Sequence, residues 1–346
     1  MIERLHLHEI TLRFAEPLVT PDGAFSYRNS VLVGAEAHGQ IGWGEAPAFP
    51  SGRWGTSEAA WAALESADVI RGEPPLPPIA SAALQSASAD LEARLAGMPM
   101  HRLLGANTGR IVARHTLGLV TDPGDLVERV GKLTSAGIKA LKVKIGPGRD
   151  MEPIGALRNA FPSIDLSVDA NGAYRNPSDP VFERLAEARV KLIEQPFPPH
   201  DLGAHAELRR RGLVAVAVDE AIHSVGDVRQ ILRAQAADVL SVKVNRLGLE
   251  ASRAILVLAQ SEGITIKVGG TFDSAIGRRM LLAFAMLDGV TDAEIAPPLG
   301  YLEADVADYP ALNGGELSPD ESPGIGVVPD RDRLARLEVR RTVVGG

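Results

Sequence analysis

The chain has 346 residues, of which 45% are hydrophobic and 23% charged, so it is long enough for a large core and two globular domains. Its formal net charge of −8 disfavours a nucleic-acid-binding protein, and the absence of cysteine excludes disulfides, thiolate catalysis and cysteine-ligated metals. No window approaches the roughly 18 apolar residues of a membrane span and the first residues do not resemble a signal peptide, so we expect a cytoplasmic enzyme that binds neither nucleic acid nor membrane.

The first part of the chain has the pattern of an antiparallel meander. Strands are predicted at residues 2–14, 30–34 and 40–43. Two irregular stretches that contain glycine and aromatic residues interrupt it, at 21–29 and 49–56. Such loops are candidate lids for a site, although local packing of Phe25, Tyr27 and Trp54 would explain the aromatic residues equally well.

Helices follow the meander. They are predicted at 57–69 and 79–95, and a proline-rich segment at 73–78 separates them. Strands and helices together predict an α+β N-terminal domain over residues 1–110.

The stretch from Leu141 to Gly270 is periodic. Short segments rich in Val, Ile and Leu end one after another in a charged residue, namely Lys144, Asp169, Glu194, Asp219 and Lys243. The intervals are 25, 25, 25 and 24 residues, and helical periodicity lies between the segments. This pattern is typical of repeated βαβ units, which build a parallel sheet or barrel.

Further elements extend the repeat on both sides. Strands are predicted at 112–119, 264–268 and 292–296, with helices at 122–136, 248–263 and 274–287. Eight strands predict a β/α barrel over residues 111–300, whose last helix is missing or degenerate. Residues 301–346 lack the period, and we expect them to run back and pack on the N-terminal domain.

Three carboxylates, Asp169, Glu194 and Asp219, end three successive strands of the repeat. Adjacent strand ends lie about 5 Å apart, so the carboxylates converge and repel one another unless a cation lies among them. All-oxygen ligation favours Mg²⁺, with Mn²⁺ as a substitute. The alternative, that each is a separate structural acid, is weakened by their common register.

The lysines flank this set. Lys142 and Lys144 point the same way from one strand, and Lys243 lies across the barrel mouth from them. A bound cation would lower the pKa of such a lysine until it accepts a proton near neutral pH, whereas salt bridges to the carboxylates are the alternative. Two lysines around a metal predict removal of a proton next to a carboxylate, because Mg²⁺ stabilises the resulting enediolate.

These motifs resemble those of the muconate-lactonizing-enzyme subgroup of the enolase superfamily. The matching sequences are Lys-Val-Lys at 142–144, Asp-Ala-Asn-Gly at 169–172, Glu-Gln-Pro at 194–196, Asp-Glu at 219–220, Lys243 within Ser-Val-Lys-Val-Asn-Arg, Gly-Trp-Gly-Glu at 42–45 and Gly-Gly-Thr-Phe-Asp-Ser-Ala-Ile-Gly-Arg at 269–278. The resemblance covers nearly the whole chain. It implies an α/β protein with a modified TIM barrel, (β/α)7β, an α+β capping domain that the C-terminal segment completes, and a homo-oligomeric state.

The resemblance also implies roles for the site residues. Lys144 and Lys243 would be the acid/base pair, and Asp169, Glu194 and Asp219 would bind Mg²⁺. Substrate-binding or supporting roles would fall to Lys142, Asn171, Glu220, Gly270, Thr271 and Asp273. The loops at 21–29 and 49–56 would close over a small carboxylate substrate.

The chain is most similar to the branch of o-succinylbenzoate synthases and N-acylamino acid racemases. The synthase carries out a dehydration in menaquinone biosynthesis and the racemase exchanges a proton between two faces, and the same residues support both. A dipeptide epimerase or a muconate cycloisomerase-like enzyme stays open, although Glu294 lacks the acidic partner that an epimerase usually has. A barrel metallohydrolase is disfavoured because no histidine marks a strand end, and an inactive binding protein because every catalytic position is filled.

Three positions depart from the family pattern. Asp273 stands where glutamate is common, Leu247-Gly248-Leu249 replaces a pair of glycines, and Lys267 occupies a usually apolar position on the seventh strand. An inward Lys267 could meet a second substrate carboxylate, whereas an outward one would be solvated or paired. We favour the outward orientation.

Overall fold

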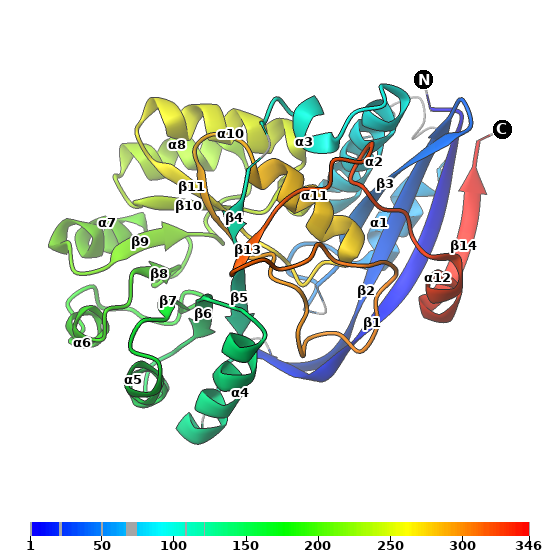
Figure 1. Cartoon of the computed structure of the whole chain (residues 1–346). Coiled ribbons are helices and arrows are strands. Elements are labelled where there is room, and N and C mark those ends of the chain that lie inside the picture. Colours follow the sequence, from blue (N-terminus) through cyan, green and yellow to red (C-terminus); the bar gives the residue numbers. More distant parts are fainter. Residues whose placement is uncertain are drawn as a thin grey trace.

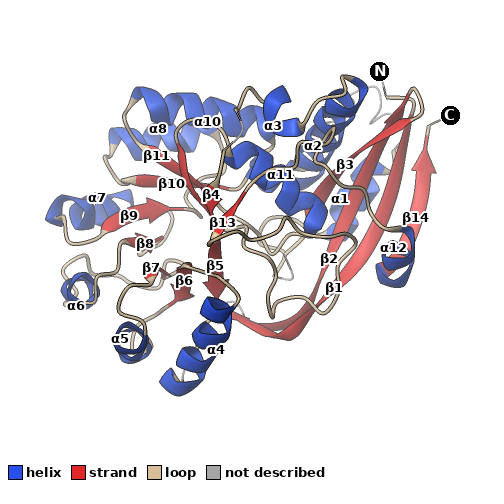
Figure 2. Cartoon of the chain, in the orientation of Figure 1, coloured by secondary structure: helices blue, strands red, loops and turns tan. Residues whose placement is uncertain are grey.

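The computed structural model describes residues 2–20, 23–49, 51–66, 75–107, 109–120 and 122–345. Figure 1 shows a β/α barrel beside an antiparallel sheet, and both termini lie at that sheet. In Figure 2 the helices lie on the outside of the barrel strands. Among the described residues, no helix is long and apolar enough to cross a membrane.

Four antiparallel strands form the capping sheet, in the order β14-β1-β2-β3. Their bounds are Arg4–Thr20 (β1), Gly23–Ala37 (β2), Gln40–Pro47 (β3) and Glu338–Val344 (β14). Leu5, Leu7 and Val33 are fully buried on the face that packs against helices α1 (Ser57–Leu64) and α2 (Pro78–Leu95). The alternating apolar residues of β1 therefore bury one side of the sheet under the two cap helices.

Strand β2 begins earlier than predicted. Residues 23–29, expected to be irregular, pair with β1 from Gly23 opposite Thr20 to Asn29 opposite Thr11. Most of these side chains are exposed or half-buried, so the alternation that marks a strand is absent from them. Residues 21, 22 and 50 of the predicted lid loops lie outside the described part of the chain, as do residues 67–74, where the first predicted helix ends.

Two glycines bring β3 into direct contact with α2. A Cβ atom on Gly42 would lie 2.1 Å from the backbone nitrogen of Leu91, and one on Gly44 would lie 2.1 Å from the carbonyl oxygen of Ala83. This close approach holds the middle of β3 against α2, and Glu45, which follows Gly44, is buried. Glu45 accepts hydrogen bonds from Arg28 and, across the domain boundary, from the backbone nitrogen of Ser274 at 2.9 Å, so it joins the cap to the barrel.

The second sheet has eight strands that neighbour one another in sequence order, from β5 to β12. Their bounds are Arg114–Leu117 (β5), Ala140–Lys144 (β6), Asp165–Asp169 (β7), Leu192–Glu194 (β8), Ala215–Val218 (β9), Val239–Val242 (β10), Thr265–Val268 (β11) and Val290–Ala293 (β12). All pairs are parallel, and an isolated bridge between Ala113 and Ala293 closes the sheet. The predicted barrel is confirmed.

Helices surround the barrel. They are α4 (Pro123–Ser135), α5 (Met151–Ala160), α6 (Val181–Glu187), α7 (Leu202–Arg211), α8 (Val225–Arg233), α9 (Val244–Leu247), α10 (Leu249–Ser261) and α11 (Ala275–Ala285), with α3 (Met100–Leu103) between cap and barrel. Side chains of Asp122, Asp201 and Ser224 cap α4, α7 and α8. Residues 294–330, all of which are described, contain no helix, so the barrel lacks its eighth one.

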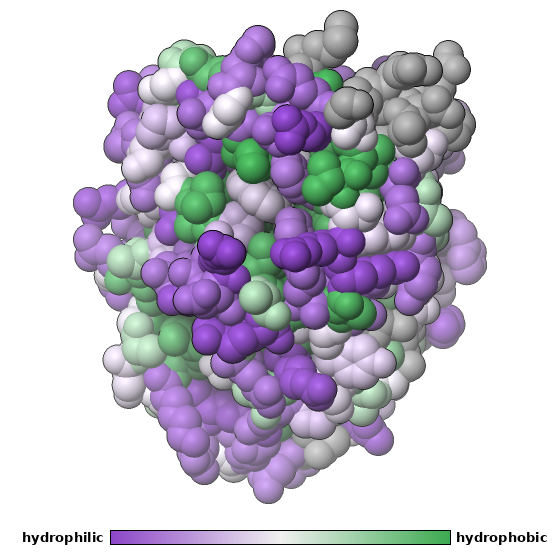
Figure 3. Space-filling model, turned by 90° about the vertical axis from the view of Figure 1, so that its right-hand side faces the viewer, coloured by the Kyte–Doolittle hydropathy of each residue, from purple (hydrophilic) through white to green (hydrophobic). Residues whose placement is uncertain are grey.

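The C-terminal segment returns to the cap. After a short pairing of β13 (Glu316–Leu317) with β4 (Ile111–Val112), helix α12 (Arg331–Leu337) leads into β14, which pairs with β1. Figure 3 shows this side of the molecule, where hydrophilic side chains predominate and hydrophobic ones form small separate groups. The N-terminal sheet is thus completed by the end of the chain.

Candidate active site

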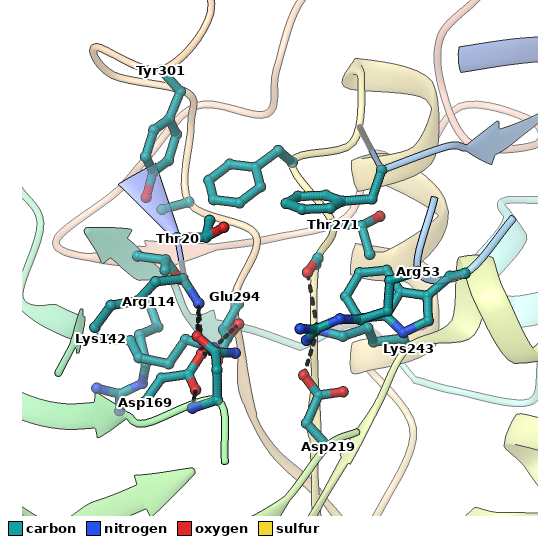
Figure 4. Close-up of a pocket in the computed structure, with 18 of the residues that line it drawn as sticks. Thr20, Arg53, Arg114, Lys142, Asp169, Asp219, Lys243, Thr271, Glu294 and Tyr301 are labelled. Atoms are coloured by element: carbon teal, nitrogen blue, oxygen red, sulfur yellow. Dashed lines mark hydrogen bonds and ion pairs between the residues drawn. The ribbon is translucent and has the colours of Figure 1, made fainter. Parts of the chain in front are cut away.

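A pocket lies at the carboxyl ends of the barrel strands, under residues of the capping domain (Figure 4). Eight of the predicted site residues line it: Lys142, Lys144, Asp169, Asn171, Asp219, Lys243, Gly270 and Thr271. The other three, Glu194, Glu220 and Asp273, lie behind this lining, each at most 5% exposed. The structure therefore brings all predicted site residues together, in two layers.

The three carboxylates lie on neighbouring strands. Asp169 pairs with Glu194 in the β7–β8 register, and Asp219 directly follows β9. Each contacts a lysine: Asp169 Oδ2 lies 3.1 Å from Lys144 Nζ, Glu194 Oε1 lies 3.0 Å from Lys142 Nζ and Asp219 Oδ2 lies 2.7 Å from Lys243 Nζ. Charges buried this deeply are tolerated because each is paired.

Lys144 and Lys243 lie on opposite sides of the pocket. Lys144 ends β6 and Lys243 follows β10, which is four strands further along the eight-stranded barrel. Figure 4 shows Lys243 with Asp219 on one side, and Asp169 with Lys142 on the other. A group bound between them would present one face to each lysine.

The pKa values in this cluster reflect the ion pairs. Burial lowers the pKa of Lys243, but Asp219, Glu194 and Glu294 together outweigh burial and raise that pKa above its ordinary value. Burial also raises the pKa of Asp219, and Lys243 opposes that rise. The protein groups alone therefore do not lower the pKa of Lys243. The lowering expected from the sequence would need a cation bound at the carboxylates.

The donor set fits a hard divalent cation. In the described part of the chain no three His, Asp or Glu side chains are arranged to hold a metal, and each of the three carboxylates is paired with a lysine. However, Asp219 Oδ1 and Glu220 Oε2 are buried and accept no hydrogen bond from described residues. Asp169, Glu194 and Asp219 supply only carboxylate oxygens, which suit Mg²⁺ or Mn²⁺.

Asn171 and Glu220 connect Lys144 with the cap. Asn171, in a left-handed conformation with φ of 44°, accepts a hydrogen bond from Lys144 Nζ at 2.6 Å and donates one to Glu220 Oε1 at 2.8 Å. Arg53, from the capping loop, donates to the same oxygen at 3.1 Å. Burial and the neighbouring Asp219 raise the pKa of Glu220 to about 7. Arg53 of the capping loop is thus linked to Lys144 through Glu220 and Asn171.

Asp273 supports Thr271 and does not line the pocket. It accepts hydrogen bonds from the Thr271 backbone nitrogen at 2.7 Å and from Thr271 Oγ1 at 2.8 Å. Gly270 leaves no room for a side chain, because a Cβ there would lie 2.6 Å from the carbonyl oxygen of Glu294. Asp273, which stands where the family often has the longer glutamate, therefore affects the pocket indirectly, by holding the lining residue Thr271 in place.

Lys267 points inward, which corrects the favoured outward orientation. Its side chain is fully buried in the barrel, where it contacts Glu194 and Glu294. It is absent from the described lining of the pocket, so it is not placed to meet a second substrate carboxylate either. Two buried carboxylates stabilise the ammonium group there and offset the cost of burying it.

Some lining residues were not predicted. Thr20, Arg114, Thr116, Arg278, Glu294 and Tyr301 join the lining from segments between or beyond the marked strand ends. Two aromatic residues of the loops differ in position. The ring centroid of Trp54 lies 5.2 Å from Lys243 Nζ, so Trp54 faces a lysine of the pocket, whereas Tyr27 is 52% exposed. Arg278 could have been predicted as a site residue, because it ends the glycine-rich motif of 269–278. No sequence signal marked Tyr301.

Known proteins are similar to this chain in sequence and fold. Residues 125–333 match the family described as enolase C-terminal domain-like. An o-succinylbenzoate synthase of Geobacillus kaustophilus is 29% identical over 97% of this chain and 95% of that protein. An N-succinylamino acid racemase of Thermus thermophilus is 33% identical over 72% of this chain and 69% of that protein.

A solved structure extends the likeness to the whole fold. The dipeptide epimerase of Cytophaga hutchinsonii, crystallised with Mg and the dipeptide D-Ala-L-Val, superposes with a TM-score of 0.89 at 22% identity and covers 100% of both chains. At this identity the likeness concerns the fold alone. The family match over more than half of the chain goes further, and it agrees with the barrel and its strand-end carboxylates: this protein is an enzyme of the enolase superfamily.

Proposed function

We propose that this enzyme removes and returns a proton on the carbon next to a substrate carboxylate, with Mg²⁺ as its cofactor. The observation that carries the proposal is the position of Lys144 and Lys243 on β6 and after β10, on opposite sides of one pocket, each beside a candidate metal ligand. Asp169, Glu194 and Asp219 would hold the cation. It would bind the substrate carboxylate and neutralise the charge that develops on its oxygens.

The two lysines define the proton chemistry. A substrate whose α carbon lies between them presents one face to Lys144 Nζ and the other to Lys243 Nζ. In racemisation, the neutral amine on one face accepts the proton and the ammonium on the other face donates one. In a dehydration, one lysine accepts the α proton while the second stays protonated and stabilises the anion. The β-hydroxyl then leaves from the same face and takes a proton from the first lysine, so that it departs as water while the carbon–carbon double bond forms. Trp54 covers Lys243 and limits access of water to it.

The substrate we propose is an N-acylamino acid, in particular an N-succinylamino acid, or the cyclohexadiene precursor of o-succinylbenzoate. The names of the relatives support both, and the second would place the enzyme in menaquinone synthesis. A dipeptide is less well supported, because an open carboxylate would be needed to bind its ammonium group. Glu294, which directly follows the last barrel strand β12, is already paired with Lys142 and Lys267.

Hydrogen exchange tests the proposal. The enzyme is incubated in D₂O with Mg²⁺ and both enantiomers of an N-succinyl and an N-acetyl amino acid, and NMR follows loss of the α proton. The precursor of o-succinylbenzoate is assayed beside them. We expect Lys144→Ala and Lys243→Ala to lower racemisation by about 10²–10⁴-fold, while each variant still exchanges the α proton of one enantiomer, a different one in each case.

The controls separate mechanism from substrate. Lys191→Ala removes an exposed lysine that pairs with Asp165 at the other end of the barrel strands and should leave every rate unchanged. Exchange without a net product would support the lysines but reject the substrate. If the magnesium-loaded wild type exchanges the α proton of none of these carboxylates, the proposed chemistry is wrong.

A further inference from the structure

We propose that Lys267 is a positioning residue that orients Glu194, a candidate magnesium ligand, through a buried network with Glu294. The proposal rests on the magnesium site proposed above. Lys267 does not line the pocket, so it would act only through the residues that it contacts.

Four charged side chains form this network at the floor of the pocket. They are Lys142, Glu194, Lys267 and Glu294, and they come from β6, β8, β11 and the residue after β12. Their exposed fractions are 3%, 0%, 0% and 7%. Burying unpaired charges would cost several kcal/mol each, but the two cations balance the two anions. Lys142 Nζ also lies 3.4 Å from Asp169, whose charge is balanced by Lys144.

The two lysines hold different oxygens of Glu194. Lys142 Nζ lies 3.0 Å from Oε1, whereas Lys267 Nζ contacts Oε2 as an ion pair without the alignment of a hydrogen bond. Lys142 alone would leave the carboxylate free to rotate about its last carbon–carbon bond. With Lys267 on the other oxygen, the plane of the carboxylate is set from two sides.

Glu294 holds both lysines in place. Lys142 Nζ lies 2.7 Å from this carboxylate, and Lys267 Nζ contacts its Oε1. Each lysine thus bridges the same two glutamates. The two lysines thereby connect the candidate ligand Glu194 with the lining residue Glu294 in one rigid unit. Without a lysine at position 267, one of the two bridges between these glutamates would be missing.

Charge and orientation make opposite predictions for this residue. A cation beside a metal ligand repels Mg²⁺, so charge alone predicts tighter binding when Lys267 is removed. Residues that orient metal ligands typically raise metal affinity by about 10–100-fold, so loss of orientation predicts weaker binding. The sign of the change therefore identifies the role.

Calorimetric titration with Mg²⁺, without substrate, measures that sign. We expect Lys267→Met to raise the Kd for Mg²⁺ by about tenfold or more. Lys191→Met changes the net charge equally, at an exposed ion pair with Asp165, and should leave the Kd unchanged. A Kd for Lys267→Met that is unchanged or lower than that of the wild type would overturn the proposal.

A second variant covers the case in which Lys267→Met does not fold. Lys267→Met combined with Glu294→Gln removes one cation and one anion, so the network stays neutral and the thermal midpoint should lie nearer that of the wild type. We still expect about tenfold weaker binding, because Oε2 of Glu194 has lost its partner. Wild-type affinity in the double variant would overturn the proposal.

The titration also separates this inference from the proposed function. If the wild type binds no Mg²⁺, both the metal site and the role of Lys267 are wrong. If it binds Mg²⁺ but acts on none of the proposed substrates, only the proposed reaction is wrong.

Discussion

Acid should destabilise this enzyme through His115. This residue is 1% exposed, and its ring stacks on Tyr301 with centroids 4.2 Å apart and planes at 3°. Burial, together with the positive charge of Arg278, lowers its pKa from 6.5 to about 3. Because the pKa is lower in the folded protein than in the unfolded chain, the unfolded chain takes up the proton first. Stability is therefore lost as the pH falls from about 6.5 towards 3.

The magnitude follows from the pKa difference. A pH of about 4.5 lies two units below the pKa of the histidine in the unfolded chain. At that pH the histidine is protonated in the unfolded chain and neutral in the folded protein. At 1.36 kcal/mol per unit, this lowers the free energy of unfolding by about 2.7 kcal/mol relative to pH 7.5. His115→Phe keeps a ring for the stack with Tyr301 but cannot titrate.

Urea unfolding at the two pH values provides the measurement. We expect the wild type to lose about 2–3 kcal/mol more than His115→Phe between pH 7.5 and 4.5, because all other titrating groups are common to both proteins. His223→Phe, at an exposed histidine, should lose as much as the wild type. Equal losses in the wild type and His115→Phe would refute a neutral, buried imidazole.

Three further predictions concern the cap and the cofactor. Gly42→Ala should destabilise the protein by about 1–3 kcal/mol or more in urea unfolding, because the new Cβ would overlap the backbone of Leu91. As a control, Gly155→Ala should be neutral or slightly stabilising, because Gly155 lies in a helix and its new Cβ would have no neighbouring atom within 4 Å. Equal effects of the two substitutions would contradict the packing explanation. Arg28→Met should cost about 3–5 kcal/mol in the same measurement, because Glu45 would keep a buried charge without its cation; a loss under 1 kcal/mol would show that this pair is dispensable. Chelation with EDTA should abolish activity but leave the circular dichroism spectrum unchanged, and Mg²⁺ or Mn²⁺ should restore activity; activity that survives complete chelation would rule out the metal-dependent mechanism.

The positions of the candidate ligands could be predicted because a β/α barrel repeats one unit. Asp169, Glu194 and Asp219 recur at nearly constant spacing, and the carboxyl ends of parallel strands meet at one edge of the sheet. No period covers the cap. The first residues of β2 were therefore missed, since most of them are exposed or half-buried and their pairing with β1 leaves no alternating pattern in the sequence.

The orientation of Lys267 could not be predicted from alternation. Ile266, Lys267 and Val268 are all fully buried, because the strand is covered on both faces, so the direction of each side chain leaves no mark in the sequence. Its partners Glu194 and Glu294 are remote in the chain. Tyr301 was missed for a similar reason, because it reaches the pocket from a segment without secondary-structure periodicity.

The pairing of β14 with β1 also has a consequence for biosynthesis. The first three strands of the capping sheet precede the barrel in the chain, whereas β14 is synthesised only after the entire barrel. Until then the outer edge of β1 has unpaired backbone groups, which are a template for association with other chains. A ribosome that stalls between the barrel and β14 would therefore release a protein with a complete barrel and an open, aggregation-prone cap.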